Sequence, residues 1–222
     1  MIKKLPIILL NFTGIYNYES FASNRNITHV DCSDINGVDC YCDEQAREEL
    51  HRRLSPFPAK ALHFIDSGDF HYLTEYWVSR LQEPFSLIVF DHHPDMQEPQ
   101  WNGVVSCGGW VTDVLEKNPL VRNIIIVGAS DELISQIPVH LREKVLFYSQ
   151  DEIDHHQAWP SKAGRLIHEP VYRLVETMCA SFPFAIYLLR MTFILPLNEN
   201  SSLRLVHSIL SIITLRDGSI SS

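Results

Sequence analysis

The segment 91–95, Asp-His-His-Pro-Asp, has the residue types and the spacing of a metal site. It directly follows the apolar run 85–90, which predicts a buried strand. Where the chain stays extended, Asp91, His93 and Asp95 share one face, because side chains alternate along a strand. Carboxylate oxygens and an imidazole nitrogen suit a divalent ion such as Mn²⁺, Fe²⁺ or Zn²⁺. The alternative is a solvated turn in which the same side chains merely cap backbone groups.

A second polar cluster follows another short strand, predicted over 61–65. The turn Asp-Ser-Gly-Asp at 66–69 leads through Phe70 to His71. Ligands of open α/β sheets collect at the carboxyl ends of strands, and here two such ends both carry aspartate and histidine. The pair of clusters therefore favours a metal site. Asp69 either supports His71 through a hydrogen bond or closes its own turn.

Together, the Ser-Gly-Asp-Phe-His segment (67–71) and the Asp-His-His-Pro-Asp segment (91–95) resemble the first two metal motifs of the arginase/agmatinase/formiminoglutamase (ureohydrolase) family. Members of that family have a Gly-Gly-Asp-His-like turn and then Asp-x-His-x-Asp after the next strand. Phe70 is an extra residue before His71 relative to the commonest form. The resemblance covers roughly residues 1–188, and the second motif is its specific part.

The resemblance implies a binuclear manganese centre. His71 would match the lone histidine ligand of the first motif, and Asp91, His93 and Asp95 would match the three ligands of the second. In the family these ligands help to hold two Mn²⁺ ions on a three-layer α/β/α fold with a mostly parallel sheet. The implied activity is that of a metal-dependent hydrolase, which cleaves a C–N bond of a guanidino, amidino or formimino compound, a small-molecule substrate.

Two divalent ions at this place would determine the chemistry. A water that bridges them loses a proton near neutral pH and becomes a hydroxide nucleophile. That hydroxide would attack the central carbon of the guanidinium or amidine. The cations keep Asp91 and Asp95 ionised, and Asp95 is our candidate catalytic residue because it would orient the hydroxide. His92 is either a neighbour of this group or a side chain that faces solvent.

The last part of the chain departs from the family pattern. A third motif, Ser-x-Asp-x-Asp, normally follows a later strand, and its aspartates complete the binuclear site. A strand is predicted over 182–188, but 189–195 contains no acidic residue. We therefore interpret 1–222 as a single arginase-like domain with an atypical tail, 189–222, that reflects either divergence or a slip of the reading frame near residue 188. We expect this chain to hydrolyse such substrates near the background rate.

Two other functions stay open. A metal-dependent deacetylase shares the fold and an Asp-x-His ligand pair but uses one zinc ion. His71 and Asp95, which offer ligands for a second ion, favour the hydrolase over the deacetylase. A truncated, non-catalytic family member is the other alternative, and the acid-free segment 189–198 favours it. Metal content separates the three, at about two manganese ions per chain, about one zinc ion, or less than one ion.

Composition excludes several classes of function. A net charge of −9 and a pI near 5.6 argue against a nucleic-acid surface. No apolar stretch reaches the length that a membrane helix needs. The apolar start, 1–10, predicts a first strand rather than a secretory signal, because Pro6 interrupts it and no cleavage pattern follows. We expect a soluble, cytoplasmic protein without nucleic-acid or membrane partners, and leave a homo-oligomer open.

Apolar runs alternate with helix-favouring segments along the chain, which predicts an α/β fold with a mostly parallel sheet. Asp43 is a predicted N-cap of the first helix. The predicted strands cover 7–12, 27–31, 63–66, 87–90, 123–128, 144–148 and 184–188, and the predicted helices cover 43–54, 72–82, 109–116, 131–136 and 171–179.

Three further groups contain residue types that bind metals or substrates. Cys32, Cys40 and Cys42 lie among aspartates, but the spacing of the last two is too tight for a zinc site, so we interpret them as reduced thiols. The segment 106–110, Ser-Cys-Gly-Gly-Trp, is either a substrate-contacting loop or an ordinary entry to the following helix. The segment 154–156, Asp-His-His, is interpreted as a solvated loop.

Overall fold

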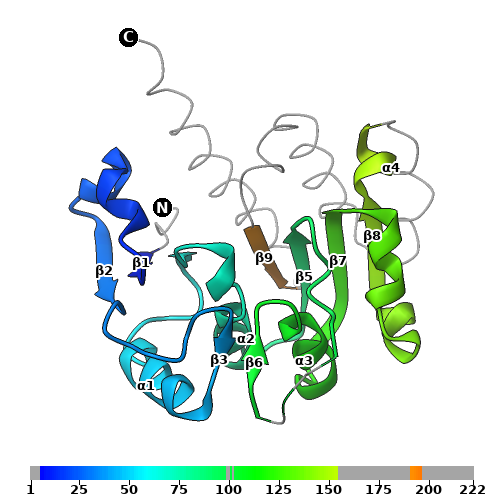
Figure 1. The fold of residues 1–222 in the computed structure, drawn as a ribbon, viewed down its shortest axis with the longest axis horizontal. Coiled ribbons are helices and arrows are strands. Elements are labelled where there is room, and N and C mark those ends of the chain that lie inside the picture. The colour runs from blue at the N-terminus through cyan, green and yellow to red at the C-terminus, as the bar shows by residue number, and fades with distance from the viewer. Residues whose placement is uncertain (1–5, 99–100, 102, 155–190, 197–222) are drawn as a thin grey trace.

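The computed structural model describes residues 6–98, 101, 103–154 and 191–196. Within these ranges, strands and helices alternate and most strand pairs are parallel, so the chain has an α/β fold (Figure 1). The predicted helix at 171–179 and the predicted strand at 184–188 lie outside the described residues.

The N-terminal half contains a three-stranded parallel sheet in the order β2-β1-β4. Its strands are β1 (Ile7–Asn11), β2 (Ile27–Asp31) and β4 (Leu62–Phe64). In the register of the sheet, Ile7 lies opposite both Ile27 and Leu62. The middle residues of β1 are buried, as expected for the central strand of a parallel sheet.

The second sheet has the order β8-β7-β5-β9. Strands β5 (Phe85–Phe90), β7 (Val121–Ala129) and β8 (Val145–Ser149) are parallel to one another. Every residue of β5 is buried, which explains why all of them except Ser86 are apolar. Strand β9 (Met191–Pro196) pairs antiparallel with β5, so this sheet is mixed.

The α-helices are α1 (Glu44–Leu54), α2 (Leu73–Ser79), α3 (Trp110–Lys117) and α4 (Gln150–Asp154). The predicted N-cap of α1 is confirmed, because the Asp43 carboxylate accepts a hydrogen bond of 2.8 Å from the Ala46 N–H. Helix α2 ends at Ser79, earlier than predicted.

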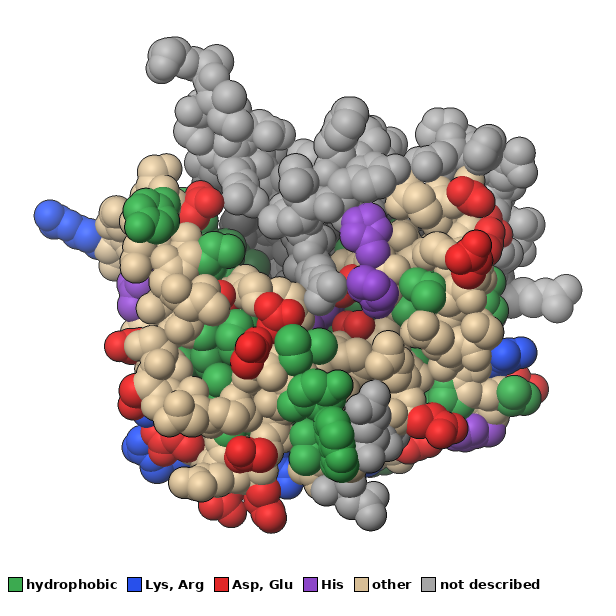
Figure 2. Space-filling view, in the orientation of Figure 1, with side chains coloured by type: hydrophobic (Ala, Val, Ile, Leu, Met, Phe, Trp, Pro, Cys, Tyr) green, Lys and Arg blue, Asp and Glu red, His purple; other side chains and the backbone are tan. Residues whose placement is uncertain are grey.

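The surface around α1 is acidic. Acidic side chains gather at the lower left of the face in Figure 2, where Figure 1 has α1.

Short elements connect these units. Strands β3 (Tyr41–Cys42) and β6 (Val105–Ser106) form a two-stranded antiparallel ribbon. The 3₁₀ helices are η1 (Ile15–Tyr18), η2 (Ser20–Ser23), η3 (Gly68–Phe70), η4 (Asp131–Gln136) and η5 (Val139–Lys144).

One continuous cluster of buried apolar side chains joins both sheets to the helices. It includes Ile8 of β1, Leu54 of α1, Trp77 of α2, Val89 of β5 and Ile126 of β7. This shared core fixes the carboxyl ends of β4 and β5 relative to each other. In the described part of the chain, no helix has the length and apolar character needed to cross a bilayer.

Asp66 anchors the carboxyl end of β4 to that of β1. Its carboxylate accepts hydrogen bonds of 2.8 Å and 2.9 Å from the backbone N–H groups of Phe12 and Thr13. The Asp66 backbone has a φ of 64°, a left-handed conformation that aspartate tolerates better than most residues. The chain therefore leaves β4 through a sharply defined turn, and this turn carries His71.

Candidate metal centre

His71, Asp91 and Asp95 converge in the interior of the protein. His71 Nδ1 lies 3.1 Å from Asp91 Oδ2 and 3.3 Å from Asp95 Oδ2. One donor atom from each residue can be chosen so that all three lie within 4.8 Å of one another. The three residues are at most 3% exposed. Two carboxylates and one imidazole therefore share a buried position at the carboxyl ends of β4 and β5.

Local packing explains where His71 points. The Ser67 hydroxyl begins the turn by accepting from the Asp69 N–H, and the His71 N–H closes it on the Gly68 carbonyl. Phe70, the extra residue of the first motif, is buried and stacks on Phe12 with ring centroids 4.1 Å apart. Because Phe70 is held in the core, the next residue, His71, is positioned to face the end of β5.

The second motif does not stay extended after β5. The Asp91 N–H continues the ladder by donating to the Val127 carbonyl, but Asp91 Oδ1 then accepts from the His93 N–H at 3.1 Å. This local bond between an aspartate and the backbone two residues later bends the chain. The condition under which Asp91, His93 and Asp95 would share one face, an extended chain, is therefore not met.

The bend separates His93 from the buried group. The His93 side chain is 53% exposed, and its Nδ1 lies 3.7 Å from Asp91 Oδ1. It is thus a surface neighbour of Asp91 rather than a third buried side chain of this motif. His92 is exposed as well. Figure 2 shows histidine side chains on the surface close to acidic ones near the middle of the face.

Asp95 is held by the start of α3, a contact that the sequence analysis missed. The Trp110 indole N–H donates to Asp95 Oδ2 at 2.8 Å, and the Val111 N–H donates to the Asp95 carbonyl at 3.1 Å. Asp95 itself has a φ of 49°. The only signal for this role in the sequence is Trp110, because a buried tryptophan usually needs a partner for its N–H.

Trp110 follows the Ser-Cys-Gly-Gly segment, for which the sequence leaves two interpretations open, a substrate-contacting loop or an ordinary entry to the following helix. The structure places Gly109 at the N-cap of α3. A β-carbon on Gly109 would lie 2.9 Å from the Gln97 carbonyl oxygen, so only glycine allows this close approach. The segment therefore brings Trp110 against the second motif, 91–95, which supports the interpretation as an entry to the helix.

The charges of His71, Asp91 and Asp95 interact strongly because all three side chains are buried. Burial on its own disfavours the charged imidazolium, but the hydrogen bonds and charges of Asp91 and Asp95 outweigh it, so the pKa of His71 is raised above its usual value. A protonated His71 then compensates part of the buried negative charge. Two carboxylates this deep need such a cation, because an unpaired buried charge is costly.

A divalent ion is an alternative source of that positive charge. Neighbouring ligands of an octahedral ion lie roughly 3.0–3.3 Å apart when the bonds are about 2.1–2.3 Å long. Ligands of a tetrahedral zinc site are about as far apart. The 3.1 Å and 3.3 Å separations of this group fit either geometry. The residues are therefore suited to hold a divalent cation without moving apart.

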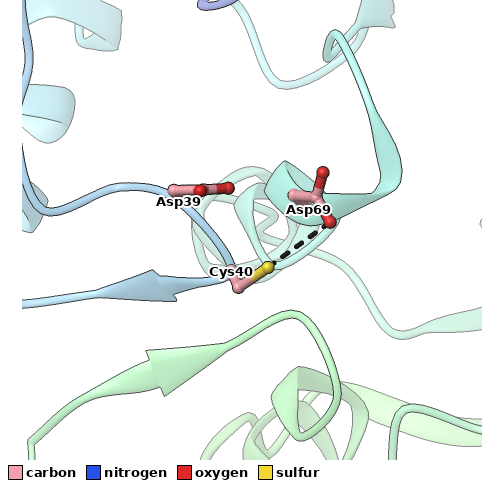
Figure 3. A group of neighbouring side chains, drawn as sticks. All are labelled: Asp39, Cys40 and Asp69. Carbon is pink, nitrogen blue, oxygen red and sulfur yellow. Dashed lines mark hydrogen bonds between the residues drawn. The ribbon is translucent and has the colours of Figure 1, made fainter.

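A second group of potential donors lies on the ribbon side of the turn that carries His71. Figure 3 shows Asp39, Cys40 and Asp69, whose donor atoms also fall within 4.8 Å of one another. The Cys40 thiol donates to Asp69 Oδ1 at 3.4 Å, and the Ser67 hydroxyl donates to Asp69 Oδ2 at 2.8 Å. Asp69 thus closes its own turn. Unlike the buried group, this one is partly exposed.

Comparisons with known proteins assign no function. No family model and no solved structure matches the chain. An uncharacterized protein of Thermotoga maritima is 28% identical over 173 residues, which are 77% of this chain and 62% of the relative. The chain thus spans less than two thirds of that protein's length.

The segment Asp-His-His at 154–156, which the sequence predicts to be a solvated loop, is described only at Asp154. Its two histidines lie outside the described residues.

Proposed function

We propose that this protein is a metal-dependent hydrolase of the ureohydrolase type, related to arginase, agmatinase and formiminoglutamase. The observation that carries the proposal is the buried convergence of His71 with Asp91 and Asp95 at the ends of two strands. The substrate class is a guanidino, amidino or formimino compound. We propose Mn²⁺ as the cofactor, and a three-layer α/β/α arrangement of the arginase kind as the finer description of the fold.

The two oxygens of Asp91 support a centre with two ions. Asp91 Oδ2 faces His71 at 3.1 Å, whereas Asp91 Oδ1 faces His93 at 3.7 Å. A carboxylate with a histidine on each side can contribute to a centre of two cations. In this proposal, His71, Asp91, His93 and Asp95 would hold the ions, with His71 and Asp95 on the buried side of Asp91 and His93 on its exposed side.

The protein contributes position and charge to the reaction. Two divalent cations at this place would supply a water molecule of lowered pKa as the nucleophile. The Trp110 N–H holds one Asp95 oxygen at 2.8 Å and fixes the orientation of that carboxylate. The exposure of His93 leaves the outer side of the centre open to solvent, which is where a small substrate would enter.

The experiment that tests the proposal counts metal ions. We expect the chain, loaded with Mn²⁺ and dialysed, to retain manganese, and Asp91→Asn to lose most of it because both ions depend on this carboxylate. His93→Ala should lower metal retention at least several-fold without unfolding the protein. His92→Ala is the matched control, since His92 is the exposed neighbour of His93, and it should retain manganese like the wild type.

Equal metal retention in all four proteins would contradict the proposed centre. One tightly bound zinc ion per chain, with little manganese, would instead support the deacetylase alternative. For catalysis, we expect hydrolysis of guanidino or amidino compounds near background, because 189–195 lacks the acids of the family's third motif. Activity should rise when a Ser-x-Asp-x-Asp segment replaces the residues after Leu188. Robust manganese-dependent hydrolysis by the unchanged chain would mean that other acids complete the centre.

A further inference from the structure

Two cysteines face each other at the end of the β3–β6 ribbon. The register pairs Tyr41 with Ser106 and Cys42 with Val105, so the next pair along the ribbon is Cys40 with Cys107. The Cys107 N–H donates to the Cys40 carbonyl at 2.8 Å, which extends the ladder to this pair. The chain thus brings together two thiols that are far apart in sequence.

A regular antiparallel ladder at this position would give a backbone spacing within the range of a disulfide. Opposite residues of a hydrogen-bonded antiparallel pair have α-carbons about 5.5 Å apart. Disulfides join residues whose α-carbons are about 4.4–6.8 Å apart. Cys40 itself is the centre of a three-residue turn, with a φ of 56° and a hydrogen bond of 2.6 Å from the Tyr41 N–H to the Asp39 carbonyl.

Accessibility distinguishes this pair from the other described cysteines. Cys40 and Cys107 are partly exposed, whereas Cys32 and Cys42 are buried. The Cys40 thiol also has a carboxylate beside it, because it donates to Asp69 Oδ1 (Figure 3). A small reagent can therefore reach the pair.

We propose that Cys40 and Cys107 are a redox-active pair that forms a reversible disulfide with a small-molecule disulfide, such as glutathione disulfide, as the oxidant. The Cys107 thiolate attacks one sulfur of the oxidant, whose S–S bond breaks and releases one glutathione thiolate. Cys40 then gives its proton to the released glutathione thiolate and attacks the Cys107 sulfur, which releases the second glutathione thiolate. The two protein protons end on these two thiolates, so the protein loses two electrons and two protons while the oxidant gains them.

The environment of Cys40 makes Cys107 the first nucleophile and makes the closing attack by Cys40 slow. Burial, and then the hydrogen bond to Asp69, raise the pKa of the Cys40 thiol to about 12, so this residue is a poor initial nucleophile. A thiol whose thiolate is not stabilised forms a disulfide that is harder to reduce. The protein disulfide should therefore form slowly and persist. This proposal does not depend on metal binding.

Mass spectrometry of the full chain tests the proposal. After incubation with glutathione disulfide and alkylation of the remaining thiols, we expect a linked peptide pair that contains Cys40 and Cys107, and its loss on treatment with dithiothreitol. Cys107→Ser should abolish the linkage. Cys42→Ala is the matched control, because Cys42 is the other cysteine of the ribbon, and it should leave the linkage unchanged.

Three results would overturn the proposal. They are a link between Cys40 and Cys42, a glutathione adduct on Cys107 that is never resolved, and no reaction at either residue. Because the linked peptide is mapped in the unchanged protein, the test does not rely on the variants folding.

Discussion

Two histidines near one another in the sequence have opposite environments. His63 lies in β4, and His71 lies in the turn that follows it. Each packs against a tryptophan: the rings of His63 and Trp77 stack at 3.8 Å, and those of His71 and Trp110 lie 5.0 Å apart. Both imidazoles are largely removed from water, yet burial leaves His63 neutral despite its contact with the Ala59 carbonyl, whereas two aspartates draw a proton to His71.

The difference shows that neighbours, rather than burial, decide which histidine belongs to a charged site. Burial lowers the pKa of His63 to about 4, because no acid offsets the loss of hydration. The same loss at His71 is outweighed by Asp91 and Asp95, and its pKa is raised. A structural histidine and a candidate ligand can thus be told apart by which side chains face the ring.

The largest expected effect comes from removing the cation of the buried group. In metal-free buffer with a chelator, His71→Ala leaves two buried carboxylates without their partner and should lower the free energy of unfolding by about 3–5 kcal/mol. Urea unfolding followed by circular dichroism measures this. His63→Ala is the matched control at neutral pH, since it removes an uncharged imidazole and should cost clearly less. Equal losses in the two variants would contradict the comparison.

The second prediction uses the pH dependence of His63. Its folded-state pKa, about 4, lies below the ordinary value of 6.5, so its contribution to stability is complete above pH 6.5. As the pH falls from 6.5 toward 4, the unfolded chain takes up a proton that the folded chain refuses. The free energy of unfolding should drop by up to about 3 kcal/mol over this range from this group alone.

Other acids titrate in the same range, so the measurement needs a reference protein. His63→Phe retains an aromatic ring against Trp77 and lacks the titrating group. The difference between the two unfolding free energies, measured at several values between pH 7 and pH 4.5, isolates His63. A difference that does not change with pH would show that His63 is not buried as a neutral ring.

The sequence predicts the strands and candidate ligands of this site better than the hydrogen bonds that orient them. The apolar run of β5, the capping role of Asp43 and the grouping of His71 with Asp91 and Asp95 all follow from local patterns. The outward turn of His93 does not, because it depends on whether Asp91 bonds to the backbone two residues later. The alternation of side chains along a strand applies only to an extended chain, and this bond bends the chain after β5.

Other features needed the folded chain or a signal that was overlooked. The antiparallel pairing of β9 with β5 cannot be derived from an apolar sequence, because such a strand fits either direction. The contact of Trp110 with Asp95 depends on how α3 meets the end of β5. By contrast, the spacing Ser-x-x-Glu at 149–152 is a signal for the start of α4. Ser149 and Glu152 each donate a backbone N–H to the side chain of the other, as in a capping box.

The smallest predicted effect compares the two tryptophans that accompany the histidines. The Trp110 N–H donates to Asp95, whereas the buried Trp77 N–H has no hydrogen-bond partner among the described residues. Trp→Phe removes an indole N–H and a similar volume at both places, so packing losses should be alike. Trp110→Phe should cost about 1–3 kcal/mol more than Trp77→Phe, because it withdraws a donor from a buried carboxylate. Urea unfolding of both variants at neutral pH measures this difference. If the two variants lose the same stability, the Trp110 bond does not hold Asp95, and the orientation of that carboxylate must come from its contact with His71 and from the backbone contact with Val111.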